Sequence, residues 1–187
     1  MDANAALQLL LNAHRLKRTP RTGWAMHGVA HGESVADHSF GVAFIALILA
    51  ELADQTLDRT KLLTMALLHD LPESAISDIP APAAARLPPG AKRVAETEVL
   101  NDLLGCLPDA GRWLAWWQEL EAGISVEARI VHDADRLDML IQAHIYEQTT
   151  GNRWLIEFWP PPGTSPFELD AARALYQALL TRRRQTT

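Results

Sequence analysis

The chain has 187 residues, and its 17 basic and 23 acidic side chains give a net charge of −6 at pH 7. This length predicts one domain, residues 1–187, with room for a sizeable core. The acidic balance argues against binding to a nucleic-acid polymer, which usually requires a basic face, but is compatible with a small phosphorylated substrate. With Cys106 as its one cysteine, the chain has neither an internal disulfide nor a cysteine-based zinc site.

Helical patterns account for most of the chain. Apolar residues spaced i, i+3 and i+4 mark a helix over residues 4–17, and a proline and glycines interrupt the pattern over 18–33. Ser34 is a candidate N-cap for a second helix that runs to about residue 53. Most of this helix is apolar all round, so we expect it to be the central buried helix. Asp58 is a candidate N-cap for a third helix that ends near His69.

The second half of the chain is also predicted to be helical. Five prolines make residues 71–90 a loop with short turns. Helices are then expected at about 91–105, 109–121, 125–150 and 166–183, with a connection rich in glycine and proline over 151–164. No β-type alternation extends beyond a few residues, so the predicted class is all-α.

Two features bear on the compartment. The N-terminal residues lack the basic segment of a signal peptide. The longest apolar run, residues 40–50, is too short to span a bilayer. We therefore expect a soluble cytoplasmic protein without a membrane partner.

His69 and Asp70 stand side by side where the third helix is predicted to end. An isolated buried carboxylate is costly, and acidic groups at a helix C-terminus oppose the helix dipole. Asp70, Glu73 and Asp78 follow one another with no lysine or arginine before Arg86. A divalent metal would stabilise this cluster, because imidazole with carboxylate suits Zn, Fe, Mn or Co. A hydrogen-bonded cap without metal is the alternative.

Two further segments offer possible ligands. His38 lies in the first turns of the predicted central helix, where a core histidine with ordinary partners is the alternative. Asp133 lies between Arg129 and Arg136 at helical spacing, so we expect it to be a solvent-exposed, ion-paired carboxylate. Asp135 shares a column with apolar residues at i−4 and i+4 and needs a partner. Asp135 is the better ligand candidate, and Asp133 stays open.

This order of residues, His38, then His69 with Asp70, then Asp135, on three predicted helices resembles that of the HD-domain phosphohydrolases. Other segments are similar to motifs of the HD-domain 5′-deoxynucleotidase family. They are Leu16 to Trp24, Glu33 to Ser39, Ala66 to Glu73 with Asp78, Asp133 to Leu137, Tyr146-Glu147 and Phe158-Trp159. The resemblance covers nearly the whole chain.

The resemblance implies an all-α HD fold, usually a homodimer, that hydrolyses deoxyribonucleoside 5′-monophosphates to nucleoside and phosphate. It implies metal ligation by four residues, His38, His69, Asp70 and Asp135. We expect a single divalent ion (Co, Mn, Zn, Fe or Mg), because His132 is the only histidine between Asp70 and Asp135.

The resemblance also implies roles around the metal. Glu73 would handle a proton beside the metal water, with Asp70 as the adjoining ligand, and Arg21 would bind phosphate. Asp78 would contact the sugar, although Ser77 stands where the family often has glycine, which leaves the sugar selectivity open. A second departure, His132 where lysine is common, leaves metal binding untouched. Trp24 is expected either to pack on the base or to anchor its loop.

Two expectations have open alternatives. Trp113, Trp116 and Trp117 share one predicted helix face, which serves either core packing or a homodimer interface. The leading function, a nucleoside-monophosphate phosphohydrolase, has two rivals. One is an HD hydrolase of a triphosphate or a guanosine alarmone, for which extra cations would come from Lys17, Arg18 and Arg21. The other is a catalytically silent helical binding protein.

Overall fold

The computed structural model describes residues 2–53 and 55–186, and within them it has helices and no β-strand, as predicted. In chain order the elements are α1 (Ala3–Ala13), η1 (His14–Arg18), α2 (Thr22–Met26), α3 (Val35–Leu52), α4 (Arg59–Leu68), α5 (Glu73–Ile76), α6 (Ala81–Ala84), α7 (Ala91–Leu104), α8 (Ala110–Ala122), α9 (Val126–Thr150), η2 (Arg153–Phe158) and α10 (Asp170–Thr186).

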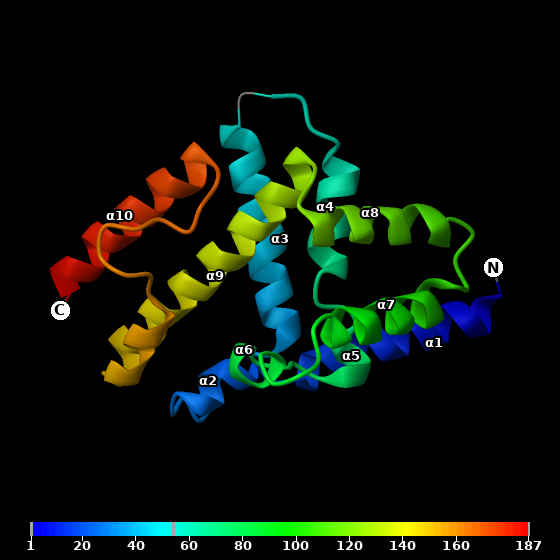
Figure 1. Cartoon of the computed structure of the whole chain (residues 1–187), viewed down its shortest axis with the longest axis horizontal. Coiled ribbons are helices and arrows are strands. Elements are labelled where there is room, and N and C mark those ends of the chain that lie inside the picture. The colour runs from blue at the N-terminus through cyan, green and yellow to red at the C-terminus, as the bar shows by residue number, and fades with distance from the viewer. Residues whose placement is uncertain (1, 54, 187) are drawn as a thin grey trace.

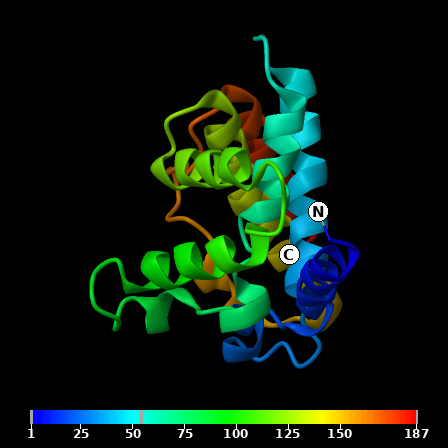
Figure 2. The same cartoon turned by 90° about the vertical axis from the view of Figure 1, so that its right-hand side faces the viewer.

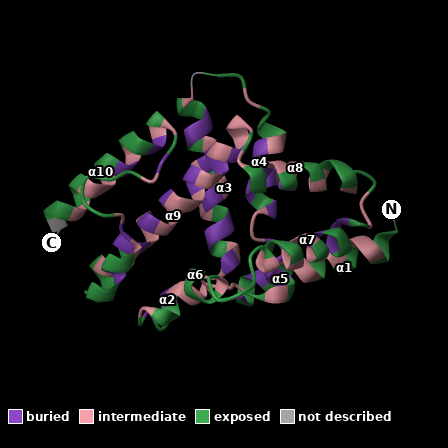
Figure 3. Ribbon diagram, viewed as in Figure 1, coloured by how far each residue is buried: buried purple, intermediate pink, exposed green. Residues whose placement is uncertain are grey.

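Helix α3 lies at the centre of the bundle. It packs against α9 and α4, while α1, α5 and α7 form a second group at one end (Figure 1). Seen from the side, α3 and α4 run side by side along the height of the molecule (Figure 2). Buried residues concentrate where α3, α4 and α9 meet (Figure 3). The prediction of a central helix is therefore confirmed.

Helix α3 is nevertheless far from fully buried. Its mean hydropathy is 1.7, and it is the helix among the described residues that is long and apolar enough, by those two criteria alone, to cross a membrane. Only 39% of it is buried. One side packs on α4 and α9, and the other leaves Phe40, Phe44, Ile48 and Leu52 exposed.

Side-chain caps explain where the main helices begin. Ser34 and Asp37 form a capping box at the start of α3, in which each side chain bonds the other residue's backbone N–H. Asp58 accepts the backbone N–H of Lys61 at the start of α4. Ser125 caps α9 in the same way. The Ser34 and Asp58 caps are those predicted from the sequence.

Short helices occupy the two segments that were expected to be irregular. The first, residues 18–33, contains α2 and is tied to the start of α3, because Val35 N–H donates to Thr19 O and Arg21 N–H donates to Glu33 O. The second, residues 71–90, contains α5 and α6. Both segments therefore return to the ends of α3 and α4, where the predicted ligands lie.

The tryptophan face of α8 packs inward. Trp117 is buried, and Trp113 and Trp116 are half-buried against the core. The α8 helix crosses α4 and α9, so this face has partners within the chain. Core packing is therefore observed on this face, and a dimer interface on it stays a prediction.

Candidate metal and phosphate site

The four predicted ligands meet at one point although they come from three helices. His38 lies in α3, His69 and Asp70 follow the end of α4, and Asp135 lies in α9. The Nε2 atoms of His38 and His69 are 3.4 Å apart, and Asp135 Oδ1 lies 3.1 Å from His38 Nε2. Asp70 Oδ2 lies 3.3 Å from His69 Nε2 and 3.7 Å from His38 Nε2. The structure thus brings the four together, and their role as ligands stays a prediction.

Hydrogen bonds at the far nitrogen of each ring set the direction of both imidazoles. His69 Nδ1 lies 2.7 Å from the carbonyl oxygen of Ala66, which can only accept, so Nδ1 carries the proton. His38 Nδ1 lies 2.7 Å from Asp138 Oδ2 and donates to that carboxylate. In the neutral rings, both Nε2 lone pairs therefore face the cluster. Outer partners of this kind are typical of metal-binding histidines.

The donor set fits a divalent cation. Two imidazole lone pairs and two carboxylates converge within a few ångströms, an arrangement that is repulsive unless a positive charge lies among them. Protons are the alternative source of that charge. Burial by itself lowers the pKa of His38, but the hydrogen bonds with Asp135 and Asp138 outweigh it and raise that pKa to about 10. Against burial, His69 and Arg21 hold the pKa of Asp70 well below its usual range.

Asp133 and Asp135 point to different sides of α9. Asp133 is fully buried and accepts the backbone N–H groups of Glu168 and Leu169 at 3.0 and 2.8 Å. It lies 3.7 Å from Arg136, so the predicted ion pair is present, but the expectation that Asp133 is solvent-exposed is wrong. Its carboxylate holds the segment before α10, whereas Asp135 faces the histidines.

Glu73 opens α5 one turn beyond Asp70 and is 2% exposed. Its Oε2 atom is buried without a hydrogen-bond partner among the described residues, and its Oε1 lies 3.9 Å from Lys92 Nζ. Burial, with the charges of Asp70 and Asp78, raises the pKa of Glu73 to about 9. A carboxylic acid that keeps its proton at neutral pH can donate it to a reacting oxygen.

Arg21 and Asp78 lie beside the cluster on adjoining loops. Arg21 Nη1 donates to Asp70 Oδ2 at 3.1 Å, which places the guanidinium next to a predicted ligand. Asp78 Oδ2 accepts the backbone N–H of Thr22 at 2.5 Å, and Thr22 Oγ1 donates to Asp78 O. Asp78 therefore ties the α5 loop to the first turn of α2. Ser77, just before it, has φ 63° and ψ 168°, a conformation that glycine adopts far more readily.

Trp24 does not face the site. It is 2% exposed, its Nε1 donates to Glu33 Oε1 at 2.9 Å, and its ring packs 4.4 Å from that of Phe158. A ring enclosed in this way anchors its loop and cannot stack on a base. The Tyr146 ring also packs edge-on against Trp24. The expectation that Trp24 binds substrate is therefore corrected to the anchoring role.

A cavity of about 590 Å³ opens onto the predicted ligands. His69, Asp70 and Asp135 form one part of its wall, and apolar side chains such as Leu87 and Leu120 form another. The remaining wall carries charged or titratable groups from α7, α8 and α9, namely Lys92, Arg93, Glu96, Glu121 and His132.

Sequence reasoning gave no role to Asp138, Lys92 or Glu96. For Asp138 a signal existed, because residues three apart lie on one face of a helix and Asp135 was already a candidate. Lys92 and Glu96 have the ordinary i, i+4 spacing of a solvent-exposed ion pair. Only the packing of α7 against α5 brings them to the site.

Comparisons with known proteins agree on one family. The HD domain family model matches residues 13–158. The 5′-deoxynucleotidase HDDC2 of Homo sapiens is 35% identical over 147 residues, which cover 78% of this chain and 70% of that protein. The HDDC2 protein of Danio rerio is also 35% identical, with coverage of 78% and 71%. A solved structure, a conserved hypothetical protein from Pyrococcus furiosus, is 39% identical with a TM-score of 0.78, covering 95% of this chain and 99% of that one.

Proposed function

We propose that this chain, which belongs to the HD-domain family, is a metal-dependent phosphohydrolase that removes the 5′-phosphate from deoxyribonucleoside monophosphates. The observation that carries the proposal is the convergence of His38, His69, Asp70 and Asp135 beside a buried, proton-holding Glu73 and the guanidinium of Arg21. The names of the similar HDDC2 proteins support the substrate class.

A divalent cation held by the four side chains would supply Lewis acidity to the phosphate oxygens. It would also lower the pKa of the attacking water, so that the water loses a proton and becomes a nucleophile near neutral pH. Because two of the four donors are imidazoles, Mn, Fe, Co or Zn suits this set better than Mg. Arg21 would bind two phosphate oxygens with its planar fork. Glu73 would hold its proton at Oε2 and release it to the departing 5′ oxygen.

The cavity supports a monophosphate over a triphosphate. Apart from the predicted ligands, its wall carries two cationic side chains, Lys92 and Arg93, which are matched by Glu96 and Glu121. No surplus positive charge is therefore provided for additional phosphates among the described wall residues. The triphosphate alternative depended on Lys17, Arg18 and Arg21. Arg21 contacts the predicted ligand Asp70, whereas Lys17 and Arg18 are exposed on η1.

Asp78 is proposed to contact the sugar through the carboxylate oxygen that Thr22 does not occupy. A carboxylate accepts hydrogen bonds from ribose hydroxyls. The hydrogen bonds between Asp78 and Thr22 fix this oxygen relative to the neighbouring Arg21. The same two loops would therefore position both the sugar contact and the phosphate contact.

One assay tests the function. The protein is loaded separately with Mn, Co, Zn, Fe or Mg and offered a panel of nucleoside mono-, di- and triphosphates, in deoxy and ribo forms. Released phosphate, pyrophosphate and triphosphate are measured. We expect hydrolysis of deoxyribonucleoside 5′-monophosphates. Release of pyrophosphate or triphosphate from triphosphates, without hydrolysis of any monophosphate, would contradict the proposal. Lack of all hydrolysis with every metal would favour the silent binding protein.

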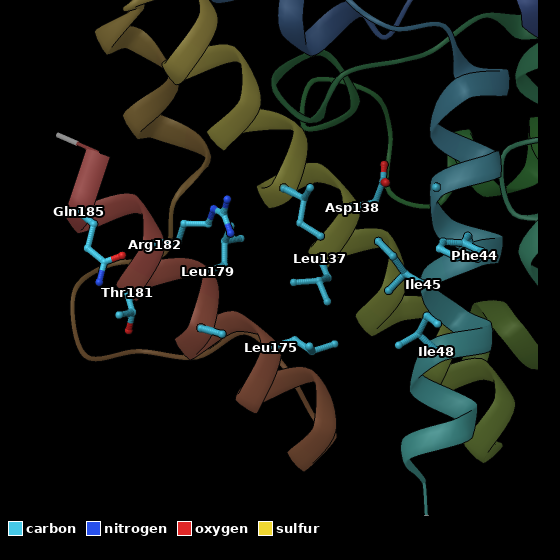
Figure 4. A pocket seen from close by; sticks show the side chains of 13 residues that line it. Phe44, Ile45, Ile48, Leu137, Asp138, Leu175, Leu179, Thr181, Arg182 and Gln185 are labelled. Carbon is cyan, nitrogen blue, oxygen red and sulfur yellow. The ribbon is translucent and has the colours of Figure 1, made fainter.

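We further propose a homodimer formed by the exposed side of α3. Phe40 and Phe44 are 73% and 56% exposed with nearly parallel rings, and Ile48 and Leu52 continue the row at 41% and 56%. A buried aromatic side chain removes about 150–250 Å² from water, so this row supplies a large share of the roughly 800 Å² that each partner of a typical interface buries. A groove of about 1040 Å³ adjoins the row, between α3 and α10 with Leu137 of α9 between them (Figure 4).

A second copy is the occupant that suits this face, because a helix row packed about a twofold axis contacts itself. Sedimentation at micromolar concentration is expected to show a dimer, and Phe40→Ser with Phe44→Ser is expected to give a monomer. Trp154→Ser, which removes an equally exposed aromatic ring on η2, serves as the control. A parent protein that is monomeric at that concentration would contradict the dimer.

A further inference from the structure

Lys92 brings an ammonium group to the cavity from a helix that contributes no predicted ligand. It lies in the first turn of α7, and its Nζ is 3.3 Å from Glu96 Oε1 and 3.9 Å from Glu73 Oε1. The cavity that Lys92 lines also exposes His69, Asp70 and Asp135. Lys92 therefore faces the space that a phosphate bound at the cluster would share.

The ammonium has donors to spare. An ammonium offers three N–H groups. Glu96 engages one of them, and the Glu73 oxygen at 3.9 Å lies beyond hydrogen-bond distance. Burial by itself lowers the pKa of Lys92, but Glu96 and Glu73 raise it above its usual value, so the group stays charged. A charged group with unused donors beside the site can accept an anionic ligand.

The charge of the site calls for a second cation. Asp70, Asp135 and Asp78 lie near the place where a phosphate dianion would bind, and Arg21 already contacts Asp70. A divalent ion and one guanidinium leave this group of charges negative once the dianion enters. An ammonium on the α7 side offsets part of the repulsion.

We propose that Lys92 binds a phosphate oxygen of the substrate from the side of α7, and that Glu96 is the positioning residue that holds Lys92 there. This inference rests on the proposed function, since it names a further phosphate-binding residue of the same site. Glu96 is suited to its role because it lies one helical turn from Lys92 and its side chain is only 12% exposed.

The experiment compares Lys92→Met, Lys92→Arg and Glu96→Gln with the parent, all loaded with metal. Lys17→Met is the matched control, because it is the same substitution at a lysine that is exposed on η1 and does not line the cavity. Four quantities are measured: kcat and KM for a deoxyribonucleoside 5′-monophosphate, the Kd of inorganic phosphate by calorimetry, the metal content and the melting temperature.

Lys92→Met is expected to weaken phosphate binding and to lower kcat/KM about ten- to a hundredfold, because a hydrogen bond to a charged group typically contributes that factor. The metal content should be unchanged. Lys92→Arg should restore most of the loss, and Glu96→Gln should give a smaller loss carried mainly by KM. Lys17→Met should match the parent within about twofold, since it removes an exposed charge outside the cavity.

Parental phosphate affinity and parental kcat/KM in Lys92→Met would overturn the inference and leave the proposed function intact. If the parent hydrolyses no nucleotide but Lys92→Met binds phosphate more weakly than the parent, the proposed function is contradicted and the phosphate contact is supported. If Lys92→Met and Lys92→Arg both melt at a lower temperature than the parent and both contain less metal, Lys92 has a structural role and the inference is also overturned.

Discussion

His38 Nδ1 lies 2.7 Å from Asp138 Oδ2, and this contact decides which nitrogen of the ring faces the cluster of predicted ligands. The two residues lie on α3 and α9, whose close approach is possible because Gly41 has no side chain. A Cβ atom on Gly41 would overlap the Asp138 carboxylate.

Gly41→Ala is therefore expected to displace Asp138 and weaken metal binding about ten- to a hundredfold, as loss of an outer partner of a metal-bound histidine typically does. Competition with a chelator of known affinity measures the effect. Gly111→Ala is the control, because a Cβ there meets open space, and it should leave metal affinity unchanged. Equal metal affinities in Gly41→Ala and the parent would refute the coupling between Asp138 and His38.

Asp135→Ala and Asp133→Ala should separate the two aspartates of α9. Asp135→Ala is expected to abolish stoichiometric metal binding, because it removes a donor that lies 3.1 Å from His38 Nε2. Asp133→Ala should retain the metal and lower the free energy of unfolding by about 1–3 kcal/mol, since the N–H groups of Glu168 and Leu169 lose their acceptor. Metal analysis and urea unfolding measure the two effects. Metal loss in Asp133→Ala alone would reverse the assignment.

Glu73→Gln is expected to keep the metal and to lower turnover about a hundred- to ten-thousandfold, the usual contribution of a general acid. Glutamine preserves the shape of the side chain but has no proton to release. Metal content and single-turnover phosphate release are the measurements. Parental turnover in Glu73→Gln would exclude the acid role.

The same variant should change the pH dependence of stability in metal-free protein. Because the pKa of Glu73 is raised to about 9, the folded state holds its proton while the unfolded state releases it above its ordinary value near 4.5. The parent therefore loses stability as pH rises between about 4.5 and 9, and Glu73→Gln lacks this loss. Melting temperatures from pH 5 to 9 should show an advantage of the variant that widens with pH. A constant difference would contradict the raised pKa.

Arg21→Lys should leave the metal bound and lower kcat/KM about ten- to a hundredfold, because a point charge replaces the planar fork that we propose binds two phosphate oxygens. Steady-state kinetics measure the loss, with Arg18→Lys as control because Arg18 is exposed on η1. Kinetics equal to the parent would show that Arg21 serves only to pair with Asp70.

Ser77→Gly should stabilise the protein by about 1 kcal/mol, because a residue other than glycine in this conformation costs on the order of 1–3 kcal/mol. Guanidinium unfolding measures the change. Ala75→Gly, in the short helix α5, is the control. It also introduces a glycine, but at a helical position, where glycine should destabilise the protein by about 0.5–1 kcal/mol. A destabilised Ser77→Gly variant would mean that the serine side chain makes a contribution larger than the strain.

The sequence by itself determined the helical class, the central helix and the caps at Ser34 and Asp58, since these follow from local periodicity and from side chains that bond backbone within one turn. It also singled out Asp70 at a helix end and Asp135 on an apolar column, because carboxylates there require partners, and their order with His38 and His69 indicated the ligand set. The short helices α2, α5 and α6 were not predicted, since segments of four or five residues carry too little periodicity.

Only the tertiary structure decided where the side chains of Trp24, Asp133, Asp138 and Lys92 lie. Each has the same local pattern whether it faces solvent, core or site, and the choice depends on a second element that is distant in the chain. Trp24 is enclosed by Phe158, Asp133 by the segment before α10, and Asp138 by α3 across Gly41. Such pairings leave no periodic signal in sequence, because a contact between helices is set by the angle and distance at which they pack.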